Sequence, residues 1–442
     1  MLNRFTTDYL ETLGQADFAP RPKISGRLAS FDGLLMEAVG LQLPVGTVCQ
    51  VGAGPGRVEA EVIGFRNGRT LLMNLGGPAP LLPHAPVRPI GPPGEAEVGS
   101  ALLGRVVDGA GKPIDGLGPI RGAKHWPLAG KLQSPLDRGR VLEPLDVGVR
   151  AINGLLTIGQ GQRVGIMAGS GVGKSVLLGM IVRAAQADVI VIGLIGERSR
   201  EVADFLETKV AGEARRRSVV VAVPANHSPV LRIRGALRAT AIAEAFRAEG
   251  KKVLLIMDSL TRVAHAGREI GLALGEPASA RGYPPSAIAM LPNLIERAGT
   301  CVSSGGSITA IYTVLADGDD GNDPVVDSAR SILDGHIVLS RALAERGVYP
   351  AIDLGPSVSR VMTDIAAPEH VKAARVLRRH LATYEENRDL VLMGAYRPGA
   401  DAAIDQAIAC HPAVMEYIRQ GADETVALTD AVAELVGVFG DA

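Results

Sequence analysis

The feature that most constrains this chain is the segment AGSGVGKS at residues 168–175. A short, mostly apolar run at residues 163–167 precedes it, and an apolar run at residues 176–182 follows it. This pattern predicts a glycine-rich turn between a buried parallel strand and a buried helix. In such a turn successive backbone N–H groups point at phosphate oxygens, and the helix N-terminus adds partial positive charge. The segment therefore predicts a phosphate loop that binds a nucleoside triphosphate.

Individual residues of the phosphate loop have expected roles. We expect Lys174 to reach the β- and γ-phosphates of the triphosphate as a point charge, and the Ser175 hydroxyl to bind Mg²⁺. Ala168 replaces the first glycine of the motif. An accidental glycine-rich turn is the alternative interpretation, and the rest of the chain has to decide between the two. The predicted ATP-binding residues of the loop are Gly169, Ser170, Gly171, Val172, Gly173, Lys174, Ser175 and Val176.

Composition narrows the class of protein. With 442 residues, 47% of them hydrophobic, the chain is long enough for two or three domains with their own cores. A formal net charge of −1 and an aromatic content of 3% argue against nucleic-acid binding. The cysteines Cys49, Cys301 and Cys410 are too widely spaced for a CxxC motif, which favours a reducing, cytosolic setting. Residues 1–20 lack the pattern of a secretory signal, and no apolar run reaches the length of a membrane span.

Hydrophobic patterning divides the chain into regions. Short alternating segments, such as residues 60–65 and 70–75, predict a small β-barrel over residues 21–92. Residues 93–365 alternate apolar strands with helical stretches, which predicts a largely parallel sheet with ligands at the carboxyl ends of its strands. In residues 366–442 apolar side chains recur every three or four positions, which predicts a helical domain. Within the middle region we expect strands at 189–195, 218–223, 253–257 and 308–314, and a helix at 237–248.

Two carboxylates follow predicted strands downstream of the phosphate loop. Asp258 ends one apolar run and is expected at the sheet edge, where it would hold the same Mg²⁺ as Ser175. The alternative for Asp258 is a cap on the next helix. Glu197, followed by Arg198, ends another strand and is placed to polarise the water that attacks the γ-phosphate. The alternative there is a solvated charge cluster at the start of a helix.

Several segments together resemble the rotary and secretion ATPases related to the catalytic subunit of ATP synthase. Those that carry the resemblance are AGSGVGKS, GERSRE at 196–201, LLIMDSLTR at 254–262 and, most specifically, PAIDLGPSVSR at 350–360. Within this superfamily, residues 147–156, 282–286 and 331–341 resemble the type III protein-export ATPases. Residues 387–396 are closer to the flagellar branch than to the injectisome branch. The resemblance spans residues 24–420.

The resemblance implies an α/β fold and an activity. The fold would be a RecA-like P-loop ATPase core with a parallel sheet, an N-terminal small β-barrel and a C-terminal helical domain. The activity would be ATP hydrolysis, with Mg²⁺, that energises type III export of flagellar proteins and delivers substrates and chaperones to the export gate. Three alternatives remain open: an injectisome secretion ATPase, a rotary ATP synthase-type catalytic subunit in a mixed ring, and a hexameric RNA translocase.

The resemblance also implies roles for particular residues. Lys174, Glu197, Arg198 and Arg360 would be catalytic, with Glu197 activating the attacking water. Asp258 would be associated with Mg²⁺, and Tyr349 would pack against adenine, although ordinary core packing is the alternative for this tyrosine. Arg360 would be an arginine finger that reaches across a subunit interface. The alternative for Arg360 is a structural salt bridge at a strand end.

The implied partners follow from the same resemblance. Because the chain carries both the phosphate loop and Arg360, identical copies would complete one another's sites in a homohexamer. Residues 1–20 would dock on a stator-like negative regulator, with a frayed end as the alternative. The acidic loop at 317–323 would contact a central stalk-like protein. The other implied partners are export-gate membrane proteins, export substrates and chaperones, and no nucleic acid is expected. The implied location is cytoplasmic, peripheral at the cytoplasmic face of the export apparatus.

Overall fold

The structure is a computed structural model and describes residues 25–77, 80–91, 94–315 and 323–440. The chain forms two compact units, residues 1–93 and residues 94–442. The N-terminal segment at residues 1–20 and most of the acidic loop at 317–323 lie outside the described residues, so the predictions made for them stay predictions.

The first unit contains a closed antiparallel β-barrel with the strand order β1-β2-β5-β4-β3-β6. Its interior is filled by small and branched apolar residues such as Ala38, Cys49 and Val62, all fully buried. The β4–β5 hairpin turns through Asn67 and Gly68, both at positive φ, which is the Asn-Gly signature of a tight turn. The predicted barrel is thus confirmed. Its strands are β1 Gly26–Phe31, β2 Leu35–Val39, β3 Val48–Val51, β4 Val58–Arg66, β5 Arg69–Asn74 and β6 Pro86–Pro89.

The second unit is built on a nine-stranded sheet with the order β17-β16-β10-β15-β13-β11-β12-β8, and β14 pairs with β15. The strands from β16 to β8 run parallel, whereas β17 and β14 are antiparallel to their neighbours. A separate two-stranded ribbon pairs β7 with β9. The bounds are β7 Glu95–Val98, β8 Val106–Val107, β9 Lys124–Pro127, β10 Arg163–Ala168, β11 Val189–Ile195, β12 Ser218–Val223, β13 Lys252–Asp258, β14 Gly299–Thr300, β15 Ser307–Leu315, β16 Gly335–Leu339 and β17 Ile352–Ser359.

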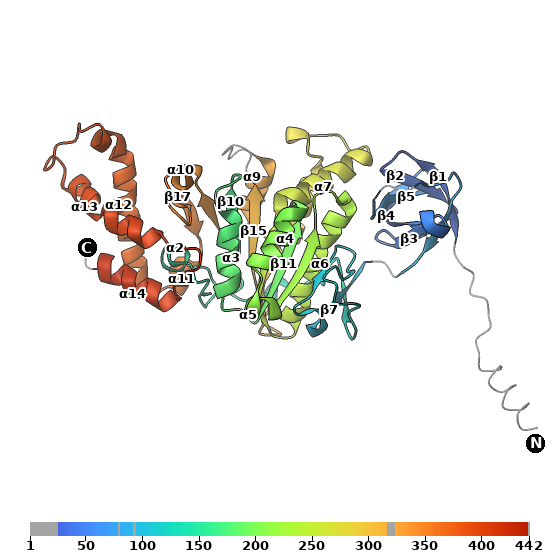
Figure 1. The fold of residues 1–442 in the computed structure, drawn as a ribbon, viewed down its shortest axis with the longest axis horizontal. Coiled ribbons are helices and arrows are strands. Elements are labelled where there is room, and N and C mark those ends of the chain that lie inside the picture. Colours follow the sequence, from blue (N-terminus) through green and yellow to red (C-terminus); the bar gives the residue numbers. More distant parts are fainter. Residues whose placement is uncertain (1–24, 78–79, 92–93, 316–322, 441–442) are drawn as a thin grey trace, which may run out of the picture. The chain divides into compact units, whose positions relative to one another are not determined.

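Helices cover both faces of this sheet (Figure 1). Alternate strand residues such as Ile166, Ile190 and Ile256 share one core with α2, α3 and the C-terminal helices. On the other face α6 packs against β11, β12 and β13, and α7 packs against β15. Both faces are therefore apolar, which explains the continuous apolar runs of the central strands. The helices of this part are α2 Arg150–Leu155, α3 Lys174–Ala184, α4 Ser199–Thr208, α5 Gly212–Arg216, α6 Pro229–Ala248, α7 Leu260–Ala273, α8 Pro285–Ile295, α9 Pro324–Ile332, α10 Arg341–Glu345 and α11 Met362–Ile365.

The element predictions for this core hold with small differences. β11 and β12 coincide with the predicted strands, and β13 and β15 are one residue longer at each end. The helix predicted at 237–248 begins earlier, at Pro229, after the Ser228 hydroxyl caps the N–H of Leu231. The buried arginines Arg232 and Arg234 near its start interrupt the apolar pattern; Arg232, for example, donates to the carboxylate of Glu269 at 2.7 Å. Sequence periodicity cannot recognise a helix face whose buried side chains are charged.

The chain ends in a helical region, as predicted. It comprises α12 Pro368–Leu392, α13 Ala402–Ile418 and α14 Leu428–Phe439, and α12 packs against both other helices. On α12, Ala374 and Leu377 belong to the predicted apolar periodicity and are buried. The region is anchored to the core by His370, whose ring nitrogen lies 2.7 Å from the carbonyl oxygen of Gly154. Among the described residues, none of the helices combines the length and apolarity that crossing a membrane requires.

Candidate active site

The phosphate loop joins β10 to α3, as the sequence predicts. Gly171 and Gly173 have φ angles of 79° and 92°, a region that favours glycine, and α3 begins at Lys174. Ala168 is the last residue of β10 and is buried in the core, together with Val172. A methyl group is therefore accommodated at this position, where the motif usually has glycine. The geometry brings the start of α3 to the carboxyl edge of the sheet.

Two carboxylates meet the ammonium group of Lys174 at this edge. The Nζ atom of Lys174 lies 3.3 Å from Oε1 of Glu197 and contacts Oδ1 of Asp258 directly. Asp258 ends β13, Glu197 follows β11, and the parallel strands deliver all three side chains to one place. Their exposed fractions are only 5% for Asp258, 13% for Glu197 and 12% for Lys174. The three predicted residues thus form one buried ionic cluster.

Burial and charge shift the pKa values within this cluster. Burial acts to lower the pKa of Lys174, but the carboxylates of Asp258 and Glu197 outweigh it and raise this pKa above the ordinary value. Burial, followed by the charge of Asp258, raises the pKa of Glu197 even though Lys174 acts against it. A carboxylate with a raised pKa is a stronger base towards water than an ordinary glutamate.

Two arginines lie near Glu197 in different settings. The side chain of Arg198 is 85% exposed and pairs with Glu201 one turn along α4, at 3.3 Å. Arg262, on α7, packs its side chain against Gly196, where an added Cβ would lie 2.6 Å from the Cβ of the arginine. The Nε atom of Arg262 is buried and has no hydrogen-bond partner within the described parts of the chain. Our reading of the sequence assigned no role to Arg262, although its place four residues after Asp258 was a usable signal.

Tyr349 lies next to the phosphate loop. A Cβ built on Gly173 would be 3.4 Å from a ring carbon of Tyr349, so the ring rests close to the loop backbone. The residue is 47% exposed, which leaves part of the ring open to a ligand. Ordinary packing, the alternative interpretation, describes the part of the ring that contacts the loop and is compatible with a ligand on the exposed part. The arrangement suits stacking on a flat heterocycle.

Gln420, which our sequence interpretation did not single out, connects Tyr349 to the helical region. Its N–H donates to the carbonyl of Tyr349 at 2.9 Å. Its side-chain amide accepts from the N–H of Arg150 at 2.7 Å and donates to the carbonyls of Gly148 and Glu424 at 2.8 and 2.9 Å. Gln420 is 5% exposed, so these bonds are made away from water. No local pattern in the sequence marks such a residue, because all its partners are distant in the chain or belong to the backbone.

Arg360 lies far from the phosphate loop of its own chain. Ser359, the last residue of β17, pairs with Gly335 at the amino end of β16, whereas the loop follows Ala168, which aligns with Leu339 at the carboxyl end. The six residues of β10 separate these two edges of the sheet by about 20 Å. The Arg360 side chain is exposed and donates to the carbonyl of Arg330 at 3.4 Å. The residue therefore sits at a surface opposite its own loop.

The donor set fits a magnesium ion that is held partly by a nucleotide. Ser175 is exposed on the first turn of α3, and Asp258 presents a carboxylate at the same edge. Within the described ranges no cluster of three or more His, Cys, Asp or Glu residues forms a self-sufficient metal site. Magnesium commonly binds through one or two protein oxygens, substrate phosphates and water, and Ser175 and Asp258 match that requirement.

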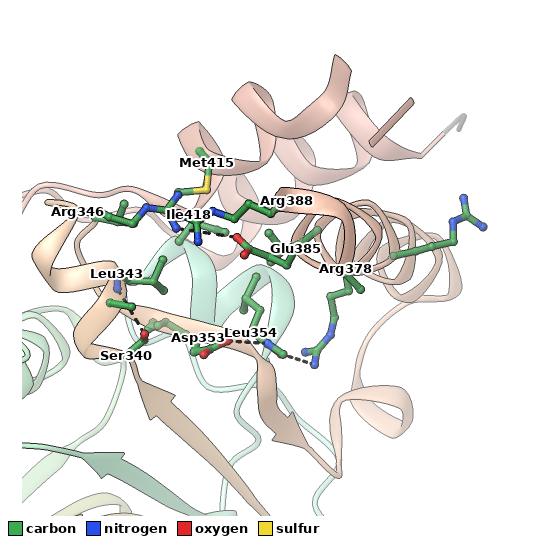
Figure 2. Close-up of a pocket in the computed structure, with 17 residues that line it drawn as sticks. Ser340, Leu343, Arg346, Asp353, Leu354, Arg378, Glu385, Arg388, Met415 and Ile418 are labelled. Atoms are coloured by element: carbon green, nitrogen blue, oxygen red, sulfur yellow. Dashed lines mark hydrogen bonds and ion pairs between the residues drawn. The ribbon is translucent and has the colours of Figure 1, made fainter. Parts of the chain in front are cut away.

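A separate cavity of about 590 Å³ lies between α10, the start of β17 and helices α12 and α13. Figure 2 shows guanidinium groups such as those of Arg346, Arg378 and Arg388 around it, with Glu385 between them. Arg378 donates to the carbonyls of Leu354 and Ser357 and so ties α12 to β17. The phosphate loop does not line this cavity, which is therefore distinct from the predicted nucleotide site.

Comparison with known proteins agrees with this geometry. Residues 148–359 match the ATP synthase alpha/beta family, nucleotide-binding domain, and residues 366–437 match the T3SS EscN ATPase C-terminal domain. The flagellum-specific ATP synthase of Pseudomonas aeruginosa is 51% identical over 95% of this chain and 94% of its own length. The chain belongs to the family of flagellum-specific ATP synthases and type 3 secretion system ATPases.

Other members of this family extend the comparison. The type 3 secretion system ATPase of Xanthomonas euvesicatoria is 45% identical over 94% of both chains. The assembled ATPase EscN from the type III secretion system of enteropathogenic E. coli superposes with a TM-score of 0.88 and 41% identity, over 94% of this chain and 100% of that one. EscN has also been solved with its central stalk EscO, and that structure gives a TM-score of 0.86 over the same shares of the two chains. These solved structures confirm the expected combination of barrel, parallel-sheet core and C-terminal helices.

Proposed function

We propose that this chain hydrolyses ATP to ADP and phosphate in order to drive flagellar type III protein export, and that it delivers substrates and chaperones to the export gate. The ionic cluster of Lys174, Glu197 and Asp258 beside the phosphate loop carries the catalytic part of this proposal. The similarity to the flagellum-specific ATP synthase of P. aeruginosa, which covers nearly the whole of both chains, supports the flagellar part.

The residues divide the chemistry between them. Backbone N–H groups of the loop bind the phosphates, and Lys174 exchanges its carboxylate partners for the β- and γ-phosphates. Glu197 then accepts a proton from the water that attacks the γ-phosphate. Ser175 and Asp258 would hold Mg²⁺, which supplies positive charge to the phosphates when bound. Arg262, Arg198 and Tyr349 complete the site, the first two as cations near Glu197 and the third as a face for adenine.

The position of Arg360 is the basis for the oligomeric state that we propose. An arginine finger stabilises charge on the transferred phosphoryl group, but Arg360 is at the opposite edge of the sheet from its own loop. It can serve only the site of a neighbouring copy. We therefore propose a homohexameric ring in which each site combines the loop of one subunit with Arg360 of the next. The assembled state of EscN supports this arrangement.

The remaining partners are proposed from related structures and from the family resemblance. The complex of EscN with its central stalk EscO supports a stalk-like partner inside the ring. A negative regulator at residues 1–20, export-gate membrane proteins and a cytoplasmic, peripheral location are proposed on the family resemblance. The sequence carries a formal net charge of −1, which offers little attraction for nucleic acid.

The catalytic part is tested by replacing Glu197→Gln. This change keeps the shape of the side chain but removes the proton acceptor, so we expect hydrolysis to fall at least about a hundredfold while ATP binding survives. Turnover is measured by phosphate release, and binding by titration with a fluorescent ATP analogue. Glu207→Gln, an exposed position on α4, is the matched control. Normal turnover in E197Q would remove Glu197 from its proposed role.

An injectisome ATPase is the second candidate, favoured by the 45% identity to the X. euvesicatoria protein. The two uses are separated by deleting the gene and examining the cells. Basal bodies without filaments, and lost swimming, would support the flagellar function. Normal flagella combined with lost secretion of other proteins would support the injectisome function instead.

A further inference from the structure

Strand β15 (Ser307–Leu315) lies between β10, which carries the phosphate loop, and β13, which ends in Asp258. Its sequence, SITAIYTVL, is mostly apolar, as expected for a strand buried on both faces. Thr313, near its carboxyl end, is fully buried. A buried hydroxyl needs a hydrogen-bond partner, and the identity of that partner indicates what the hydroxyl does in the structure.

The hydroxyl of Thr313 is directed at Asp258. Its Oγ1 atom lies 2.5 Å from Oδ1 of Asp258 and 3.4 Å from the carbonyl oxygen of Met257. A hydroxyl has one proton to donate, and the nearer, charged acceptor takes it. The same Oδ1 atom contacts the ammonium of Lys174. One carboxylate oxygen of Asp258 therefore receives two donors, one mobile and one fixed in the sheet.

The two donors have different fates when nucleotide binds. In the proposed mechanism Lys174 turns to the phosphates, which leaves Oδ1 with the hydroxyl of Thr313. We propose that Thr313 is a positioning residue, which keeps the Asp258 carboxylate in its place at the end of β13 so that it can serve Mg²⁺ after Lys174 has moved. This inference rests on the proposed ATPase function and assigns a role to a residue that touches neither phosphate nor metal.

A second threonine on the same strand provides the contrast. Thr309 is also buried, and its Oγ1 accepts from the N–H of Gly161 at 2.8 Å, near the opposite end of β15. Its hydroxyl oxygen provides the hydrogen-bond partner of a backbone N–H in the turn before β10 and lies outside the ionic cluster. Replacing either threonine by valine removes one buried hydrogen bond and keeps the volume of the side chain. Only the change at Thr313 is expected to alter the response to Mg²⁺.

The test compares Thr313→Val, Thr313→Ser and Thr309→Val in the full chain. Loss of a hydrogen bond to a charged group typically lowers an equilibrium constant by about tenfold. T313V should therefore need about ten times more Mg²⁺ for half-maximal hydrolysis. Its affinity for a fluorescent ATP analogue should fall in Mg²⁺ but stay unchanged in EDTA. T313S, which keeps the hydroxyl, and T309V should both behave as the unmodified chain in these two measurements. Thermal unfolding checks each variant, and T313A replaces T313V if the valine variant does not fold.

Three results would overturn the inference. The first is an unchanged Mg²⁺ requirement in a folded T313V or T313A variant. The second is an equal loss of nucleotide affinity with and without Mg²⁺, which would indicate a purely structural hydroxyl. The third is a T313S variant as damaged as T313V, because packing of the methyl group would then be the cause. Failure of the ATPase proposal itself looks different, since the unmodified chain would then not hydrolyse ATP.

Discussion

At the scale of single residues, the nucleotide pocket depends on a close approach between Tyr349 and Gly173. The ring lies so near the loop that a side chain on Gly173 would be in van der Waals contact with it, at 3.4 Å. Gly173 also needs its positive φ of 92°, which other residues rarely adopt. The positive φ of the loop therefore favours glycine here, and the ring of Tyr349 packs beside it.

The role of the ring is tested with Tyr349→Ala and Tyr349→Phe. Loss of an aromatic stacking partner for a base typically costs about 1–3 kcal/mol, so Y349A should raise the KM for ATP about tenfold with a smaller effect on kcat. Y349F keeps the ring and should resemble the unmodified protein. Steady-state kinetics measure both constants. An unchanged KM in Y349A would mean that adenine does not pack on this face.

At the scale of elements, the connection between α13 and α14 is joined to the nucleotide-binding core through Gln420. The segment before α2 supplies further bonds: the side chain of Asp146 accepts from the side chain of Asn153 and from the N–H of Leu428. The helical region therefore holds the backbone of Tyr349 in place. Movements of the C-terminal helices and of the ring of Tyr349, the proposed face for adenine, are expected to be coupled.

Replacing Gln420→Ala tests this coupling. The change removes the side-chain partner of the N–H of Arg150 and of the carbonyl of Glu424, while the carbonyl of Gly148 keeps the N–H of Val426, so we expect a loss of about 2–3 kcal/mol in the free energy of unfolding. The main-chain N–H at position 420 can still bind the carbonyl of Tyr349, but the side-chain bonds that hold this segment are lost, so the KM for ATP should also rise several-fold. Denaturant unfolding and kinetics are the measurements, and the exposed Gln186→Ala is the control. A KM that stays normal despite lower stability would argue against the coupling.

The sequence predicted the elements well where apolar runs were uninterrupted, as in β11 and β12. It predicted Lys174, Glu197 and Asp258 because each follows a strand that ends at one sheet edge. It did not predict Thr313, since a threonine in a buried strand is ordinary by composition. Gln420 was missed for a related reason, because its partners are brought together only by tertiary packing. The start of α6 was missed because buried arginines interrupt its apolar pattern.

At the scale of the whole molecule, the loop and Arg360 occupy opposite edges of one sheet. In the proposed mechanism a single subunit would therefore present half of one site at each edge. Completing such sites would require head-to-tail contacts, which close into a ring if the rotation between copies permits it.

Mixing two inactive variants tests the shared site. Lys174→Ala and Arg360→Ala should each be nearly inactive alone, because an arginine finger contributes about a thousandfold or more to the rate. In rings assembled from equal amounts of both, about one quarter of the interfaces should combine an intact loop with an intact Arg360. We expect ATP hydrolysis to recover to a comparable fraction.

The mixing experiment has two controls. Arg121→Ala, at an exposed position, should hydrolyse ATP normally. Mass measurement of differently tagged variants verifies that mixed rings formed. Full activity in R360A alone, or no recovery in verified mixed rings, would contradict a site completed by the neighbour.

The separation of Arg360 from the loop also has a genetic consequence. If the site is shared as proposed, a subunit that lacks both a working Lys174 and a working Arg360 would damage its own site and that of its neighbour. Each defective copy in a ring would then remove two sites. In a cell that makes intact and defective chains together, the defective allele should be dominant, and its effect should grow faster than its share of the protein.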